Sequence, residues 1–339
     1  MIRVLTNERW FDGQRFDGLR VEVRPVPERG VWNVVRELLG ARRPHVVVLS
    51  GAPRTLLLLC LLKRLLPFSR WKLVSVDLVP RPRSTLVQRA RAQLIRFLFG
   101  AVDLFIVFCR DASGMQQVYG IPSERICYVP FKINGYPDVL AAPVRDDGYI
   151  LACGRTYRDY RTFGKAMQGL PYAAFVLTQP AELSYHGGDL DLAALPANVT
   201  LVRHDGAQSS WNDWIARAKF VVLPILPSVL NPAGISVYLL SMALGKCVII
   251  TEGPATRGML DDGQAVIVPP GDPTALRDAI VRVSELPVYR AHVARAGREY
   301  ALSLGGEDRL ANDVVRVVMT RVLARAGSWA QERAAPAEG

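Results

Sequence analysis

Several residue types are scarce in this sequence of 339 residues. It holds only 4 His and 5 Cys, and the cysteines are scattered without a Cys-x-x-Cys pair. An odd, scattered set of cysteines in apolar runs is typical of buried thiols in a reducing compartment. No His cluster accompanies them, so we expect no metal site.

Long apolar runs are also missing. The longest, Thr55–Leu62, is cut by Lys63 and Arg64, whereas a helix that spans a bilayer needs about 20 apolar residues. The chain opens directly into a short apolar strand pattern after Met1, without the pattern of a signal peptide. We therefore expect a cytoplasmic protein whose contact with a membrane, if it has one, is peripheral.

Acidic residues are scarce in the first part of the chain. Residues 1–142 hold 22 Lys and Arg against 11 Asp and Glu, whereas residues 143–339 hold 20 of each. The excess is strongest in residues 51–100, with ten basic residues and one acidic residue. Such a one-sided field attracts an anionic surface or substrate.

The length and the 50% hydrophobic content suit two domains. Strand and helix patterns alternate along the first part and restart after residues 134–147, a segment rich in Gly, Pro and Asp that we interpret as a linker. This alternation predicts parallel sheets covered by helices. We place the domains at 1–140 and 141–309, followed by a helix over 310–327 and a disordered tail over 328–339.

The most informative stretch is Pro227–Pro270. Gly234 precedes an apolar periodic run that predicts a helix, and a glycine at a helix start allows close approach of an anion such as a diphosphate. Lys246–Thr251 then has the β-branched composition of a buried parallel strand.

The order Pro-Ser, Gly, apolar helix, M-A-x-G-K-x-V-I-x-T, D-G and V-P-P-G-D resembles the nucleotide-sugar half of retaining GT-B glycosyltransferases of the family 4 (group 1) type. Ala101–Ile133 resembles the end of that family's first domain, whereas residues 1–70 match poorly. The resemblance implies an α/β fold of two Rossmann-like doubly wound domains facing a central cleft, with the helix over 310–327 crossing back to the first domain. An ordinary β-α-β unit of an unrelated doubly wound fold is the alternative interpretation.

The resemblance also implies an activity. The protein would transfer a hexosyl group from a nucleotide-diphosphate sugar to a lipid-linked or polysaccharide acceptor, with retention, without a metal and without any cofactor besides the donor substrate. Nucleic acid is not expected as a partner, because no nucleic-acid motif accompanies the basic charge. The alternatives are a catalytically inactive GT-B scaffold and a nucleotide-sugar epimerase.

Gly154 and Arg155 fall where the family has G-R-x(4)-K-G, whose cations neutralise the donor diphosphate. The Lys-Gly pair is missing, so Arg158 or Arg161 could supply the second positive charge. The alternative is a surface arginine that pairs with Asp159.

The resemblance places further donor contacts at His204, Gly234, Ile235, Ser236 and Ser241. Asn231 stands near the first Glu of the family's E-x(7)-E motif, and we take it as a catalytic candidate. The second Glu falls near Leu240 and Ser241, neither of which is acidic. His204 either flanks the nucleobase or is an ordinary surface-loop histidine.

Asp77 is the second catalytic candidate. It follows the predicted strand Lys72–Val76, at the end of a parallel strand where ligands bind. It could orient an acceptor hydroxyl or stabilise an oxocarbenium-like transition state. A turn aspartate before Pro80 is the alternative.

The run Arg81–Phe99 combines leucines and Phe97 with Arg89, Arg91 and Arg96 in a basic amphipathic helix pattern. Such helices lie on anionic bilayers, and Leu57–Trp71 adds a second apolar and basic stretch. We therefore expect contact with the inner face of an anionic membrane through Arg81–Phe99. The alternative is a sheet-covering helix with a solvated arginine face.

Overall fold

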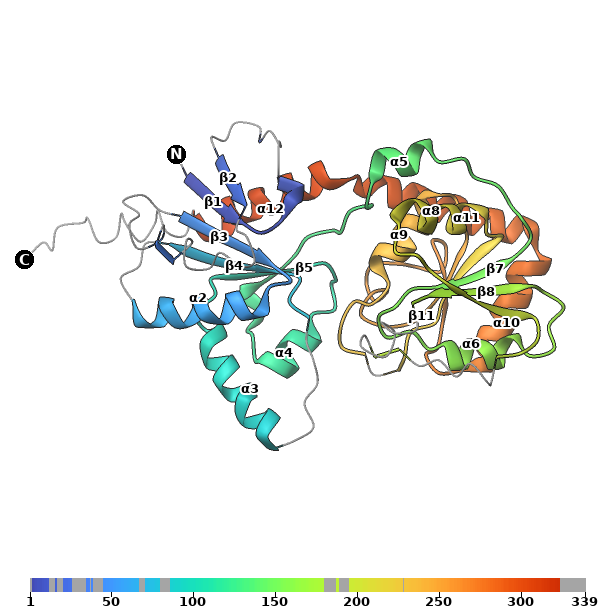
Figure 1. Ribbon diagram of the computed structural model, residues 1–339, viewed down its shortest axis with the longest axis horizontal. Helices are drawn as coiled ribbons and strands as arrows, with labels where there is room; N and C mark the ends of the chain where they lie inside the picture. The colour runs from blue at the N-terminus through green and yellow to red at the C-terminus, as the bar shows by residue number, and fades with distance from the viewer. Residues whose placement is uncertain are drawn as a thin grey trace, which may run out of the picture. The chain divides into compact units, whose positions relative to one another are not determined.

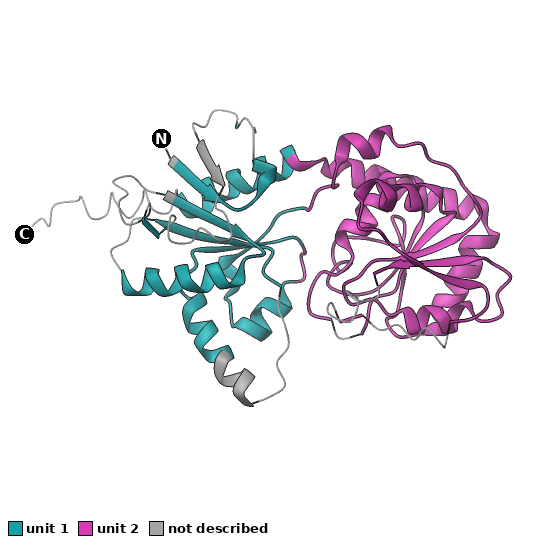
Figure 2. Ribbon diagram, in the orientation of Figure 1, with its two compact units in different colours: residues 1–108, 112–130, 308–339 teal, residues 109–111, 131–307 magenta. Residues whose placement is uncertain are grey.

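The computed structural model describes residues 2–11, 16, 21–25, 35–36, 38, 45–66, 71–79, 86–179, 187–188, 195–227 and 229–323. It divides into two compact units (Figure 2): unit 1 is Met1–Phe108, Ala112–Pro130 and Asp308–Gly339, and unit 2 is Cys109–Asp111 and Phe131–Glu307. The predicted tail 328–339 and most of a helix expected over residues 31–41 lie outside the described residues.

Unit 1 is built on a six-stranded sheet in the order β2-β1-β3-β4-β5-β6, and every neighbouring pair is parallel. The strands are β1 (Ile2–Thr6), β2 (Val21–Pro25), β3 (His45–Ser50), β4 (Lys72–Val76), β5 (Leu104–Val107) and β6 (Ile126–Tyr128). Runs of Val, Leu and Ile without alternation produce strands that are buried on both faces, as in β3 and β5.

Three helices connect the later strands of unit 1: α2 (Pro53–Leu65), α3 (Leu86–Phe99) and α4 (Ser113–Tyr119). Their apolar faces pack on the sheet in a core that includes Leu59, Leu73 and Phe105. From the other end of the chain, α12 (Glu307–Val318) and a π-helical segment (Met319–Leu323) fall in unit 1 from Asp308 onward (Figure 2).

Unit 2 contains a second six-stranded parallel sheet, in the order β12-β11-β10-β7-β8-β9 (Figure 1). The strands are β7 (Ile150–Cys153), β8 (Ala174–Thr178), β9 (Val199–Arg203), β10 (Phe220–Leu223), β11 (Val248–Thr251) and β12 (Val266–Val268). The chain runs outward from β7 through β9 and then returns to the other side of β7 with β10. Ligands of doubly wound sheets bind at the carboxyl ends of the strands where the order reverses, which here are β7 and β10.

The helices of unit 2 are α5 (Tyr136–Ala141), α6 (Tyr160–Met167), α8 (Gln208–Arg217), α9 (Ile235–Ala243), α10 (Pro273–Glu285) and α11 (Pro287–Leu304). Residues 134–147, which we interpreted as a linker, contain α5. Gly135 adopts a left-handed conformation directly before α5 and Pro137 occupies its first turn. Both residues that suggested a loop therefore start a helix.

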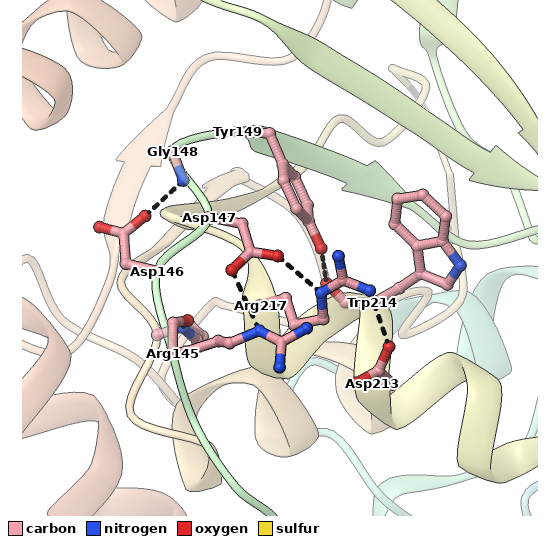
Figure 3. Close-up of polar contacts among 9 residues, drawn as sticks. Arg145, Asp146, Asp147, Gly148, Tyr149, Asp213, Trp214 and Arg217 are labelled. Carbon is pink, nitrogen blue, oxygen red and sulfur yellow. Dashed lines mark hydrogen bonds and ion pairs between the residues drawn. The ribbon is translucent and has the colours of Figure 1, made fainter.

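Residues 145–149 are held against α8 by polar contacts (Figure 3). Arg217 donates to Asp147 Oδ2 at 2.7 Å and to Asp213 Oδ2 at 3.2 Å, and Arg145 donates to Asp147 Oδ1 at 3.1 Å. The Tyr149 hydroxyl donates to the Trp214 carbonyl at 2.7 Å. These contacts fix the entry of the chain into β7, although exposed ion pairs contribute little stability individually.

No helix in the described ranges is long and apolar enough to cross a membrane. Within the same ranges, no group of three His, Cys, Asp or Glu side chains could hold a metal ion. All five cysteines are free thiols.

Candidate functional site

A pocket of about 270 Å³ lies in unit 2 at the carboxyl ends of β7 and β10. Its lining residues are Asn134, Gly154, Arg155, Thr156, Arg158, Gln179, His204, Gly206, Ala207, Gln208, Trp211, Gly234, Ser236, Val237 and Leu240. This set contains two arginines and a histidine but no Asp or Glu. The pocket therefore favours an anionic ligand.

Arg158 is the most unusual residue of this lining. Arg158 is buried, with only 2% of the residue exposed. Its Nε donates to the Cys153 carbonyl at 2.8 Å, and its Nη1 donates to the Thr156 carbonyl at 2.8 Å. No carboxylate of the described residues pairs with it, and burial lowers the pKa of its guanidinium. A buried charge without a counterion is unfavourable, so an anion bound here would stabilise the site.

The loop that carries Arg158 is fixed by the neighbouring strand. The Asp159 amide donates to the Pro224 carbonyl at 2.9 Å, and the Leu226 amide donates to the Tyr157 carbonyl at 2.9 Å. The Asp159 carboxylate accepts from the Thr162 amide and caps α6. The loop after β7 is thus tied to the loop after β10.

One glycine makes room for the guanidinium, and a second lies beside it. Gly154 has φ +119°, and a Cβ there would overlap the guanidinium of Arg158. Gly234 has φ +106° at the start of α9, where a Cβ would lie 4.0 Å from Arg158 Nη2. Nη2, which has no acceptor among the described residues, therefore lies near the first turn of α9, where free backbone amides favour anions.

Arg155 is exposed at the rim of the pocket, with its Nη1 3.5 Å from Gln179 Oε1. Arg161, the other candidate for the second cation, is exposed on α6 and does not line the pocket. The structure thus brings Arg155 and Arg158 together and leaves Arg161 outside.

His204 and Trp211 form the apolar side of the pocket. Their rings meet edge to face with centroids 4.9 Å apart, and His204 Nδ1 accepts from the Gly206 amide at 2.9 Å. His204 Nε2 is buried without a hydrogen bond in the described part of the chain, although Asp205 Oδ1 lies 3.4 Å away. The sequence analysis missed Trp211 and Gln179, which also line the pocket. Both follow the carboxyl ends of strands, β9 and β8, that end at the same edge of the sheet as β7, and this position could have indicated them.

Six predicted donor residues line this pocket: Gly154, Arg155, Arg158, His204, Gly234 and Ser236. The structure does not bring the side chains of Ile235 and Ser241 to it. Ile235 is buried, and Ser241 donates from Oγ to the Val237 carbonyl at 2.8 Å. Ser241 follows Ser236 by five positions and so lies on another face of α9, whereas Leu240 reaches the pocket.

Asn231 is also absent from the lining. It is 4% exposed, and its Oδ1 has no hydrogen-bond partner within the described ranges. Its backbone carbonyl accepts from the Ala233 amide at 2.8 Å, which shapes the turn before Gly234. A buried amide oxygen without a partner is unfavourable.

Asp77 belongs to unit 1, where it directly follows β4. Its φ of +53° is the left-handed conformation that Asp and Asn tolerate better than most residues. Burial raises the pKa of the carboxyl from its usual 3.8 to about 6, and the nearby charge of Glu8 adds to this shift.

The Asp77→Asn variant should be more stable than the wild type at about pH 8 but not at about pH 4. Because the folded-state pKa exceeds the unfolded-state value, the stability contribution is present at low pH and lost as the pH rises through about 6. Asn keeps the left-handed backbone and removes the charge. We expect a gain of about 3 kcal/mol at high pH, since each pH unit between 3.8 and about 6 corresponds to about 1.4 kcal/mol. Thermal unfolding at both pH values measures this gain. An equal gain at both would contradict the assigned titration.

The comparisons with known proteins point to unit 2. Residues 149–285 match the family described as "Glycosyl transferases group 1". No sequence among the curated proteins matches the chain. The family match lies within unit 2 and includes β7, α9 and every pocket residue except Asn134.

Solved structures match over nearly the whole chain. Anabaena Alr3699/HepE in complex with UDP-glucose has a TM-score of 0.64 at 11% identity, covering 94% of this chain and 100% of that one. The sucrose-phosphate synthase of Thermosynechococcus elongatus has a TM-score of 0.63 at 17% identity, covering 93% and 83%. The UDP-forming trehalose-phosphate synthase of Burkholderia xenovorans has a TM-score of 0.59 at 13% identity, covering 85% and 76%. The chain therefore has the GT-B fold of two Rossmann-like α/β domains, with its match to the group 1 glycosyl transferases in the second.

Proposed function

We propose that this protein is a glycosyltransferase of the family 4 type that binds a nucleotide-diphosphate sugar in the unit 2 pocket. The observation that carries the proposal is Arg158, a buried cation whose guanidinium donates to backbone carbonyls among the described residues and whose Nη2 lies near the start of α9. A diphosphate supplies the missing negative charge there, and a guanidinium binds phosphate oxygens in a fixed fork. HepE in complex with UDP-glucose adds support from fold similarity.

The proposed reaction transfers a hexosyl group with retention. The bond between the anomeric carbon and the leaving phosphate oxygen breaks, and the acceptor hydroxyl oxygen bonds to the same face of that carbon. The leaving phosphate takes the proton of the acceptor hydroxyl, so the products are the glycoside and the nucleoside diphosphate. Arg158 and the first amides of α9 stabilise the charge that develops on the leaving phosphate.

Asp77 and Asn231 have separate proposed roles. The Asp77 carboxylate orients the acceptor or stabilises the oxocarbenium-like transition state. Asn231, buried three residues before Gly234, acts on the donor side. The proposal requires no metal, because the cationic groups of the pocket neutralise the diphosphate.

For the acceptor we propose a lipid-linked glycan or a growing polysaccharide at the cytoplasmic face of a membrane. The excess of basic residues in residues 1–142 supports an anionic acceptor or surface. The five free thiols support a reducing compartment.

The test is calorimetric titration of the full chain with UDP, GDP, ADP and their common sugar conjugates. We expect one nucleoside diphosphate to bind, and Arg158→Lys to weaken it about 10–100-fold, since charge-assisted hydrogen bonds contribute about 1.5–3 kcal/mol. Arg155→Gln should weaken it about fivefold, because Arg155 is exposed. Lys165→Gln is the matched control, as Lys165 is exposed on α6 outside the pocket.

Two outcomes would count against the proposal. If none of the nucleotides binds, the cation pocket does not hold a diphosphate. If a nucleotide binds but no sugar is transferred to any glycan or lipid acceptor, the chain is a nucleotide-binding scaffold and not a transferase.

A further inference from the structure

Five large apolar side chains are exposed on two neighbouring helices of unit 1 and at the residue that follows the first of them. Leu65, Leu94 and Phe97 are 67%, 59% and 58% exposed, and Leu61 and Leu66 accompany them. The helices α2 and α3 pack side by side against the same sheet (Figure 1). We call these five residues the α2–α3 face. Contiguous exposed apolar patches of this kind mark interaction sites.

A cation joins the two halves of this face. The guanidinium carbon of Arg64, on α2, lies 4.2 Å from the centroid of the Phe97 ring on α3. Arg64 Nη2 also donates to the Phe97 carbonyl at 2.5 Å. Arg64 of α2 therefore lies against Phe97 of α3, which places a positive charge beside the exposed apolar residues of both helices.

The arginines around the face carry charge that no described carboxylate neutralises. Arg96 donates to the Gln117 and Val118 carbonyls at 2.9 and 3.3 Å, and Arg125 donates to the Gly100 carbonyl at 3.0 Å. Arg217 of unit 2, by contrast, pairs with two carboxylates. Carbonyl oxygens fix the direction of a guanidinium but leave its full charge in place.

We propose that the α2–α3 face binds anionic lipid bilayers, with its leucines and Phe97 in the acyl boundary and its arginines at the headgroups. Both properties of the face fit this partner: the apolar area is exposed, and no described carboxylate pairs with Arg64, Arg96 or Arg125, whereas Asp103 is paired with Lys63 of α2. A second copy of the chain would satisfy the apolar area but would bring like charges together. The predicted membrane contact thus extends from Arg81–Phe99 onto α2. Arg81 lies outside the described residues, and the side chains of Arg89 and Arg91 are not described.

The test is co-sedimentation of the full chain with vesicles of phosphatidylcholine alone and with phosphatidylglycerol added. No nucleotide or acceptor is present, so failure here is distinct from failure of the proposed function. We expect binding only with phosphatidylglycerol. It should fall as salt is raised from about 0.1 M to 1 M, which shortens the screening length from about 10 Å to about 3 Å.

Two sets of variants separate the charged and apolar contributions. Arg64→Gln with Arg96→Gln should weaken binding about 25-fold, since a basic residue near an anionic leaflet contributes about fivefold. Phe97→Gln should weaken it about tenfold through lost apolar burial. Val288→Gln is the matched control, because Val288 is 83% exposed and belongs to unit 2, whereas the α2–α3 face belongs to unit 1. Circular dichroism checks that each variant is folded.

Three results would overturn the proposal. Equal binding to neutral vesicles would remove the role of the arginines. Equal losses in Phe97→Gln and Val288→Gln would remove the role of the face. A dimer in solution that Phe97→Gln dissociates, without vesicle binding, would assign the face to contact between copies.

Discussion

Replacing Gly154 with alanine should weaken nucleoside-diphosphate binding by about 10–100-fold while the chain remains folded. At φ +119° an alanine is strained, and its Cβ overlaps the guanidinium of Arg158. The strain costs about 1–3 kcal/mol, and displacing the guanidinium removes charge-assisted hydrogen bonds of about 1.5–3 kcal/mol. Calorimetric titration with the nucleotide that binds the wild type measures the effect.

Gly169→Ala provides the matched control. Gly169 also has a positive φ, +72°, in unit 2, but nothing lies within 4 Å of its added Cβ. It should lose a similar amount of stability and keep nucleotide affinity. If Gly154→Ala binds the nucleotide as the wild type does, the placement of the diphosphate beside Arg158 is wrong.

Asp77→Asn should lower sugar transfer by about 10²–10⁴-fold, the range of a catalytic carboxylate. Nucleotide affinity should not change, because Asp77 is in unit 1 and the pocket is in unit 2. The variant expected to gain stability at high pH is thus expected to lose turnover. Steady-state rates at saturating donor measure this loss.

The pH dependence of the transfer rate tests the catalytic role of Asp77 in a second way. With a pKa of about 6, Asp77 is increasingly ionised as the pH rises from about 5 to 7, so the wild-type rate should rise over this range. Asp77→Asn should flatten that rise, and Glu124→Gln, an exposed carboxylate of the same unit, should not. A residual rate in Asp77→Asn close to that of the wild type would assign Asp77 to the turn alone.

Much of the fold follows from local patterns. The strand predicted at Lys72–Val76 is β4 with the same bounds, because its apolar run ends at the polar Asp77. α5 was missed because Gly135 and Pro137 are typical of loops. In the structure they occupy the start of the helix. The sequence carries that distinction only weakly, since the same residues begin helices and end them.

The sequence indicated the loop that carries the cations but not which of the cations is enclosed. The family resemblance suggested Arg155 with Arg158 or Arg161 as the cations, and only burial distinguishes Arg158 as the enclosed one. Ser241 was assigned a contact because one residue of register in α9 separates it from Leu240, which lines the pocket. Trp211 was missed because its approach to His204 depends on how the loop after β9 folds back.

A crystal structure of the full chain with the nucleoside diphosphate selected by the titration would test the central claim most directly. We predict diphosphate oxygens within hydrogen-bond distance of the Arg158 guanidinium and of the Ile235 and Ser236 amides, with the base near His204 and Trp211. A nucleotide bound elsewhere, with the cation pocket filled only by solvent at saturating ligand, would contradict the account.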